Sequence, residues 1–292
     1  MKKLLFILLL YPLSAYSQDG QKPIIDMHLH DYTEQTYFVA PASDGTMSPA
    51  SLAEFHEQVL AIQKKYNIVK AVVSTIGGPN TLQDDKKWIP GYYTNKPPTD
   101  TVAFIKLIES GELKVFGEIG AVYGGYTLSH PDFEPYLDIC ERYDIPVAVH
   151  TGGGPPNITY QCCPDFRLKY GDPLTVEDVL AKHPKLRIYI MHAGEVFYEN
   201  ALRLMLQYPQ LYADLGVILW VGKQPMDYAE RLLRQAKEYG LIDRIMYGSD
   251  QMVWPHGIEK SIQQLDSYDF LSEADKRKIF YENAARFLRL DE

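Results

Sequence analysis

Two histidines separated by one residue follow a short apolar run near the start of the chain. The segment PIIDMHLH places His28 and His30 after Ile24 and Ile25, which we expect to form a short buried strand. Residues two apart on a strand project from the same face, so the two imidazoles should lie together. Imidazole nitrogens are ligands of zinc, iron and nickel, and Asp26 on the same face could orient one ring. The pair therefore predicts half of a divalent-metal site.

Further acidic and histidine side chains close other apolar runs along the chain. They are Glu118 in FGEIG, His150 in VAVHTGGG, His192 in IYIMHAGE and Asp250 in MYGSD. Each one alone has an ordinary explanation, such as a solvated strand end or a turn cap. Five strand ends that carry metal-type ligands are the convergence expected of an active site, and together they predict a metal centre.

An alternation of strands and helices would bring these residues to one place. We predict strands at 24–25, 68–75, 88–93, 113–119, 146–150, 187–192, 211–215 and 244–250, interleaved with helices at 49–66, 99–110, 131–143, 175–183, 195–208, 225–239 and 273–288. This α/β pattern over 292 residues predicts one (β/α)8 barrel of the TIM type, in which functional groups gather at the carboxyl ends of the strands. A doubly wound sheet would require a glycine-rich phosphate turn after the first strand, where this chain has histidines.

The composition narrows the class of partner. A hydrophobic fraction of 46% and a charged fraction of 23% are typical of a globular protein with a sizeable core. The net charge of −9 argues against nucleic acid, because phosphate binding requires a basic face. We therefore expect a small-molecule substrate.

The first 17 residues have the composition of a secretory signal peptide. Lys2 and Lys3 precede the apolar run 4–10, and Ala15-Tyr16-Ser17 forms a small-x-small cleavage site. We expect cleavage near Ser17, a secreted or periplasmic protein, and a barrel formed by residues 18–292. No later segment is long and apolar enough to cross a membrane.

The three cysteines, Cys140, Cys162 and Cys163, do not form a disulfide framework. The adjacent pair Cys162-Cys163 could be redox-active or could contact a metal. We expect instead two small loop residues and no bridge.

Several motifs resemble the amidohydrolase superfamily, and in particular its amidohydrolase-related branch of metal-dependent hydrolases. They are DMHLH, the HTGG after the fifth strand, MHAGE, YGSD and the closing ENAARFL, and the resemblance covers residues 23–290. It implies a distorted (β/α)8 barrel with one or two divalent ions, most often zinc. It also implies a possible homodimer, since barrels of this kind often pair.

The resemblance also implies a division of the ligands. His28, His30 and Asp250 would hold a first ion, and His150 and His192 a second. In members with one ion, His150 joins the first three ligands and His192 acts as acid and base. Glu118 is similar to the bridging glutamate of TatD-like hydrolases, whereas the loop and terminal motifs look more like the branch that contains decarboxylases.

The expected function is hydrolysis of an amide, lactone, ester or phosphoester bond by a metal-activated water. Asp250 would accept the proton of the water and pass it to the leaving group, and His192, where it is not a ligand, would polarise the substrate. A metal-dependent non-oxidative decarboxylase is the alternative enzyme, and a non-catalytic binding barrel is the second alternative. Candidate substrate contacts on the loops at this face are Tyr123, Tyr126, Arg167, Trp254 and His256.

Overall fold

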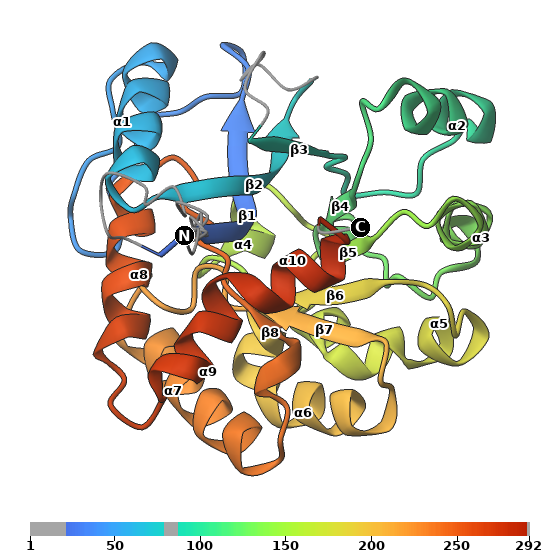
Figure 1. Cartoon of the computed structure of the whole chain (residues 1–292). Coiled ribbons are helices and arrows are strands. Elements are labelled where there is room, and N and C mark those ends of the chain that lie inside the picture. Colours follow the sequence, from blue (N-terminus) through green and yellow to red (C-terminus); the bar gives the residue numbers. More distant parts are fainter. Residues whose placement is uncertain (1–21, 79–86, 291–292) are drawn as a thin grey trace, which may run out of the picture.

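Runs rich in Ile, Val, Leu and Tyr form eight strands in the computed structural model, which describes residues 22–78 and 87–290 (Figure 1). The strands are β1 Ile24–Tyr32, β2 Ile68–Ile76, β3 Trp88–Gly91, β4 Phe116–Ile119, β5 Val147–His150, β6 Ile188–Met191, β7 Leu211–Asp214 and β8 Ile245–Met246. All six strand pairings are parallel. Parallel neighbours require long crossover connections, so their carboxyl ends share one face. The expected signal peptide, residues 1–17, lies outside the described residues.

Backbone contacts at two seams close these strands into a barrel. β1–β3 pair in sequence order, as do β4–β8. The seam between β3 and β4 is joined by two bridges, Gly91 with Val115 and Thr94 with Ile119. At the other seam, the amide of Met27 donates to the carbonyl of Tyr247 at 2.9 Å, and the amide of Asp250 donates to the carbonyl of His28 at 2.7 Å. The predicted (β/α)8 barrel is confirmed.

The barrel interior is filled by apolar side chains drawn from strands on all its sides. The cluster contains Ile25, Met27, Val72, Ile89, Val115, Ala148, Tyr189, Met191 and Met246. The buried Tyr189 hydroxyl donates to the Met27 carbonyl at 2.9 Å, which ties β6 to β1 across the interior. Because Ile25 and Met27 precede His28 on β1, this cluster forms the floor beneath the two histidines.

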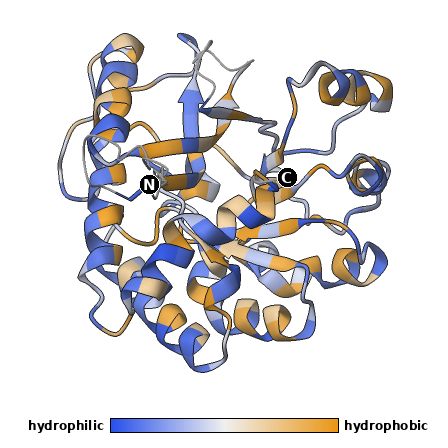
Figure 2. Ribbon diagram, in the orientation of Figure 1, coloured by the Kyte–Doolittle hydropathy of each residue, from blue (hydrophilic) through white to orange (hydrophobic). Residues whose placement is uncertain are grey.

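Helices surround the barrel, with a larger apolar core between them and the strands. They are α1 Leu52–Lys65, α2 Thr101–Ser110, α3 Glu134–Tyr143, α4 Ile158–Gln161, α5 Glu177–Lys182, α6 Tyr198–Gln207, α7 Lys223–Glu238, α8 His256–Ser267, α9 Glu273–Arg277 and α10 Asn283–Leu288. Helix α7 buries Ala229, Leu232, Leu233 and Ala236, which confirms that its apolar spacing packs on the barrel. Figure 2 shows hydrophobic and hydrophilic residues on the same outer helices, as expected for helices with one buried face.

The last strand is shorter than predicted. We expected it over 244–250, but β8 ends at Met246. Beyond Met246 the backbone no longer forms strand hydrogen bonds with β7. The amide of Ser249 donates to the Asp26 carboxylate at 2.9 Å, and Asp250 has a φ of 43°. A positive φ is incompatible with an extended strand, so the residues after β8 are shaped by the site.

The sequence analysis missed helix α8 and joined two helices at the C-terminus. Gly257 near the start of α8 disguised it, because glycine disfavours helices. A Cβ at this position would lie 2.7 Å from the Trp220 ring, so close packing explains the glycine. The helix predicted at 273–288 is divided into α9 and α10 by a π-helical turn, Lys278–Glu282.

Cys162 and Cys163 are joined by a disulfide, so the expectation of no bridge was wrong. The bond connects adjacent residues at the end of α4, where sequence spacing gives no sign of pairing. Cys140 is buried as a free thiol. In the described ranges, no helix combines the length and apolar character needed to cross a bilayer.

Replacing Asn283 with alanine should lower the free energy of unfolding by about 1–3 kcal/mol, because buried carbonyls would lose their donor. The buried Asn283 amide donates to the carbonyls of Ile242 and Ile245, both at 2.7 Å, and so holds α10 to β8. Urea unfolding would measure the change. The exposed neighbour supplies the control, since Glu282→Ala should cost less than about 0.5 kcal/mol. Equal effects of the two variants would contradict this role for Asn283.

Candidate metal centre

Six side chains singled out in the sequence meet at the carboxyl ends of the strands. All are buried, and they come from β1, β4, β5 and the segments after β6 and β8: His28, His30, Glu118, His150, His192 and Asp250. The predicted convergence therefore exists in the fold. As predicted, His28 and His30 lie together, with their ring centroids 5.2 Å apart.

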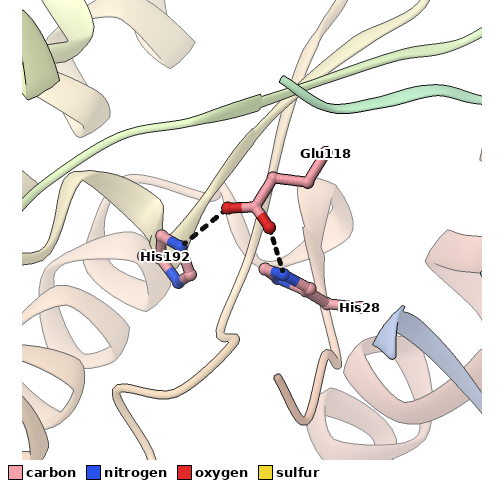
Figure 3. Close-up of side chains that lie close together, drawn as sticks. All are labelled: His28, Glu118 and His192. Carbon is pink, nitrogen blue, oxygen red and sulfur yellow. Dashed lines mark ion pairs between the residues drawn. The ribbon is translucent and has the colours of Figure 1, made fainter. Parts of the chain in front are cut away.

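The Glu118 carboxylate lies between two pairs of imidazoles. Its Oε2 atom is 3.1 Å from His30 Nε2 and 3.5 Å from His28 Nε2. Its Oε1 atom is 2.7 Å from His150 Nδ1 and 3.8 Å from His192 Nε2. Figure 3 shows this carboxylate between His28 and His192, with one oxygen toward each. One side chain thus presents a separate oxygen to each half of the cluster.

Asp250 approaches the cluster from the opposite seam of the barrel. Its Oδ1 atom lies 3.2 Å from His30 Nε2 and 3.7 Å from His28 Nε2, and its Oδ2 atom lies 3.7 Å from His192 Nδ1. The hydrogen bond from its own amide to the His28 carbonyl fixes Asp250 to β1. The strand-one histidines are therefore flanked by two carboxylates.

Each imidazole has one ring nitrogen held by an acceptor outside the cluster. The pairs are His28 Nδ1 with Asp214 Oδ2 at 3.2 Å, His30 Nδ1 with the Ser74 carbonyl at 3.2 Å, His150 Nε2 with the Gly153 carbonyl at 2.9 Å, and His192 Nδ1 with the Gly216 carbonyl at 3.0 Å. A carbonyl can only accept, so in His30, His150 and His192 these contacts favour a proton on the outer nitrogen, whereas the contact of His28 Nδ1 with Asp214 is an ion pair and not a hydrogen bond. Once the inner nitrogen of a ring has lost any proton, its lone pair is free to bind a cation, which is the usual arrangement of ligating histidines.

Asp214 is the functional residue that the sequence analysis missed. Its Oδ1 atom accepts from the amides of His192 and Gly216, both at 2.9 Å, while Oδ2 faces His28. We expected Asp26 to orient an imidazole, and this was wrong, because Asp26 accepts from the backbone amides of His28 and Ser249. Asp214 closes the predicted strand 211–215, so the strand-end rule used for the other ligands would have found it.

The donor set fits a divalent cation. Within the described part of the chain, His28 Nε2 and Asp250 Oδ1 are buried atoms with no hydrogen-bond partner. Two overlapping groups, His28 with Glu118 and His192, and His28 with His30 and Asp250, have ligand atoms within 4.8 Å of one another. Unpartnered buried polar atoms are costly unless something binds them. Nitrogen and carboxylate donors suit zinc, manganese or iron.

The charges of the cluster control its protonation. Burial lowers the pKa of His30, but the adjacent carboxylates of Asp250 and Glu118 outweigh it and raise this pKa to about 9. Burial likewise opposes charge on Asp250, but the imidazoles of His28 and His30 lower its pKa to about 2. The pKa of His28 lies well above its ordinary value, since Asp250 and Asp214 outweigh burial. Without a cation, protons on the imidazoles therefore balance the carboxylates.

Positive φ angles are concentrated in the segments that carry the cluster. They occur at His192 (61°), Ala193 (47°) and Glu195 (45°) after β6, and at Asp250 (43°) after β8. Left-handed backbone at a non-glycine residue is unfavourable and persists only where surrounding contacts impose it. Here the hydrogen bonds of Asp214 and of the His28 carbonyl impose it.

The five candidate substrate residues lie in different places. Tyr123 is beside the cluster, with its ring centroid 5.0 Å from that of His150. Tyr126 packs on His130, and the Arg167 guanidinium donates to the carbonyls of Pro164 and Phe166 in its own loop. Trp254 donates to the Ala40 carbonyl, and His256 lies 3.7 Å from Asp44. The contacts of Tyr123 bring it to the cluster, whereas those of the other four lie elsewhere.

Gly216→Ala should weaken metal binding by at least about tenfold while the barrel stays folded. A Cβ at this position would lie 2.5 Å from His28 Nδ1 and 3.2 Å from Asp214 Oδ1, so the ring would have to move. Equilibrium dialysis against zinc would measure the affinity, and circular dichroism the fold. The control is Gly222→Ala, because a Cβ there has no atom within 4 Å. Unchanged affinity in Gly216→Ala would show that the position of His28 is unimportant.

Metal affinity should rise with pH up to about pH 9, because His30 has a pKa of about 9 without metal and must lose its proton before Nε2 can ligate. Below that pKa the bound proton competes with the cation. Calorimetric zinc titrations at pH 7, in buffers with different ionisation enthalpies, would count the protons released. His30→Gln should reduce that count, whereas replacing the partly exposed His130, which lies outside the cluster, with glutamine should not. Binding without proton release at pH 7 would contradict this prediction.

Comparisons with known proteins agree on the family and the fold. Residues 94–290 match the amidohydrolase family model, which is more than half of the chain. Among curated proteins, the Protein fluG of Emericella nidulans is 24% identical over 110 residues, or 38% of this chain. The matched region spans only 12% of that relative's length.

Solved structures share the barrel over almost the whole chain at low identity. An uncharacterised TIM-barrel protein from Bordetella bronchiseptica has a TM-score of 0.65 at 18% identity and covers 92% of this chain and 99% of its own. A probable 2-pyrone-4,6-dicarboxylic acid hydrolase from Acinetobacter baumannii scores 0.60 at 16%, covering 91% and 99%. A dihydroxybenzoic acid decarboxylase from Polaromonas sp. JS666, with bound manganese, scores 0.60 at 14%, covering 93% and 98%.

The family match spans the strand-four to strand-eight part of the site, including Glu118, His150, His192 and Asp250. The resemblance of the sequence motifs is thereby confirmed. This chain belongs to the amidohydrolase superfamily, in the Amidohydrolase_2 family.

Proposed function

We propose that this protein is a metal-dependent hydrolase that cleaves an amide, lactone, ester or phosphoester bond of a small molecule. The observation that carries the proposal is the position of Glu118, whose two oxygens face separate pairs of imidazoles. A carboxylate placed in this way suits a bridge between two cations. The family contains both metal-dependent hydrolases and decarboxylases, and a bridged centre favours hydrolysis.

The ligands divide into two groups around Glu118. His28, His30 and Asp250 would hold one cation, and His150 and His192 the other. Zinc is the ion we propose first, since the imidazole-rich donor set suits it. When bound, such cations lower the pKa of a coordinated water and polarise the bond to be cleaved.

The protein's own groups would position the reactants and move the proton. Asp250 Oδ1 is buried, has no hydrogen-bond partner in the described residues and lies beside the strand-one imidazoles, so it is placed to take a proton from water and return it to the leaving group. Asp214 would keep the His28 ring in one tautomer and orientation. The ring of Tyr123 packs edge to face against the His150 imidazole and would limit the access of water to it.

Non-oxidative decarboxylation is the second candidate, and one contact favours it. Glu118 Oε1 lies 2.7 Å from His150 Nδ1, so when this nitrogen carries a proton the carboxylate would accept a hydrogen bond from it instead of binding a metal. The remaining group, His28, His30 and Asp250, would then hold a single cation. A single ion fits the decarboxylase members of the family.

We also propose that the protein works outside the cytoplasm, after removal of residues 1–17. This proposal rests on the basic start, the apolar run and the small-residue cleavage site of the N-terminal sequence.

Elemental analysis of the purified protein should find about two metal ions per chain, falling to one or fewer in Glu118→Ala, because the carboxylate would bridge them. Glu112→Ala, which removes an exposed acid on the same segment, should keep the full content. The loaded protein should hydrolyse a member of a panel of lactones, amides and phosphoesters without releasing carbon dioxide. One ion per chain, unchanged in Glu118→Ala, together with carbon dioxide release, would replace hydrolysis with decarboxylation.

A further inference from the structure

A cavity of about 360 Å³ opens between the loop after β5 and the start of α7. Its walls include Gly153, Gly154, Tyr160, Phe166, Glu195 and Tyr228. The loop that forms most of it, residues 151–172, also carries the short helix α4. The cavity is distinct from the buried cluster of ligands, but it shares a wall with it.

Two sets of contacts connect this cavity to the cluster. The Gly153 carbonyl accepts from His150 Nε2 at 2.9 Å, and the Gly153 amide donates to Glu195 Oε2 at 2.6 Å. The Tyr123 ring continues the wall, because its centroid is 5.0 Å from His150 and 5.4 Å from Phe166. The cavity and the ligand cluster therefore adjoin each other across Gly153 and the Tyr123 ring.

The lining combines aromatic rings with one carboxylate. Tyr160, Phe166 and Tyr228 supply the rings, and Glu195 is the only charged residue among the described residues that line the cavity. The loop carries two cationic side chains: the Arg167 guanidinium is bonded to the carbonyls of Pro164 and Phe166, and Lys169 Nζ lies 5.4 Å from the centre of the Tyr170 ring. The negative charge of Glu195 is thus not balanced by a lysine or arginine of the cavity wall.

The backbone is strained where it places this carboxylate. Ala193, Gly194 and Glu195 have consecutive positive φ angles of 47°, 80° and 45°. These angles turn the chain back from β6, so that Glu195 reaches the β5 loop. Tyr160, in contrast, is 89% exposed, and a bulky ring with so little cover has open space for a ligand.

We propose that this cavity is a substrate subsite for a positively charged alkylammonium group, held by Glu195 and by the faces of the aromatic rings. This inference rests on the proposed function, since it identifies the substrate class of the same site. A cation over aromatic rings is attracted by their negative faces, and a neighbouring carboxylate adds to that attraction. The overall net charge of −9 also favours the approach of cations over anions.

A cationic substrate would differ from the acids named in the descriptions of the solved relatives. One of those structures is a decarboxylase in complex with 2,6-dihydroxybenzoate, and another is a probable 2-pyrone-4,6-dicarboxylic acid hydrolase with citric acid bound; all these acids are anions at neutral pH. A carboxylate in this cavity would face Glu195 with no cation of the lining to pair with it. We therefore expect the protein to discriminate against such acids.

Calorimetric binding of two molecules of one shape would test the charge preference on the metal-loaded protein. The probes are choline and its neutral isostere 3,3-dimethylbutan-1-ol. We expect choline to bind at least about tenfold more tightly than the alcohol. Equal binding of the two, or tighter binding of the alcohol, would overturn the proposal.

Three variants would test whether the preference for choline depends on the residues of the cavity. Glu195→Gln removes the charge but keeps an oxygen for the Gly153 amide, and it should abolish most of the choline preference. Tyr160→Ala should weaken choline several-fold, and its exposure makes unfolding an unsuitable explanation. Glu199→Gln is the matched control, because it removes an exposed charge from α6 outside the cavity. An equal loss in Glu199→Gln would overturn the assignment to Glu195.

Metal content measured on the same samples keeps this inference separate from the proposed function. A protein that holds its ions and hydrolyses substrates but does not prefer choline would overturn the cation subsite alone. A protein that prefers choline but binds no metal would support the subsite and overturn the hydrolase.

Discussion

The contacts of Asp214 are the constraint on which the rest of the site depends. One oxygen accepts from the amides of His192 and Gly216, and the other faces His28. A buried carboxylate that accepts from the backbone after β6 and β7 and forms an ion pair with a ring on β1 links three strand ends. Gly216 and Gly248 lie against this pair with no room for a side chain, so the sequence there is restricted by the position of the imidazole. The geometry of the ligands is thus set by residues that are not themselves ligands.

The same principle explains why the loops after β6 and β8 have unusual backbone angles. His192 and Asp250 must aim inward at the cluster while their amides remain bonded to Asp214 and to the His28 carbonyl. An extended continuation of either strand would direct these side chains elsewhere, because successive residues of a strand alternate between faces. The unfavourable φ angles are the cost of bringing ligands from separate strands to one point, and the packed barrel floor beneath them resists relaxation.

The barrel and the ligand cluster could be predicted from the sequence because both follow from periodic patterns. Apolar runs gave the strands, and the polar residue that closes each run gave Glu118, His150 and His192. Other features had no such signal. Helix α8 was hidden by Gly257, whose reason is the Trp220 ring, and the disulfide joins adjacent residues in a loop. Acceptors such as the Gly153 carbonyl belong to the backbone, so residue types cannot show them.

The sequence predicts the chemistry better than the choice of substrate, because the ligands depend on the strands and the cavity depends on loops. His28, His30, Glu118 and His150 stand on strands whose register is fixed by the pairing of neighbours. His192 and Asp250 follow strands and are held by Asp214 and the His28 carbonyl. The cavity is built instead from the loop 151–172, and Glu195 reaches it after four residues in a row, 192–195, with positive φ. The single carboxylate of the cavity, that of Glu195, has no role in the proposed metal chemistry. For that reason the charge of the cavity, and not the ligand set shared with the family, should decide which molecules this protein accepts.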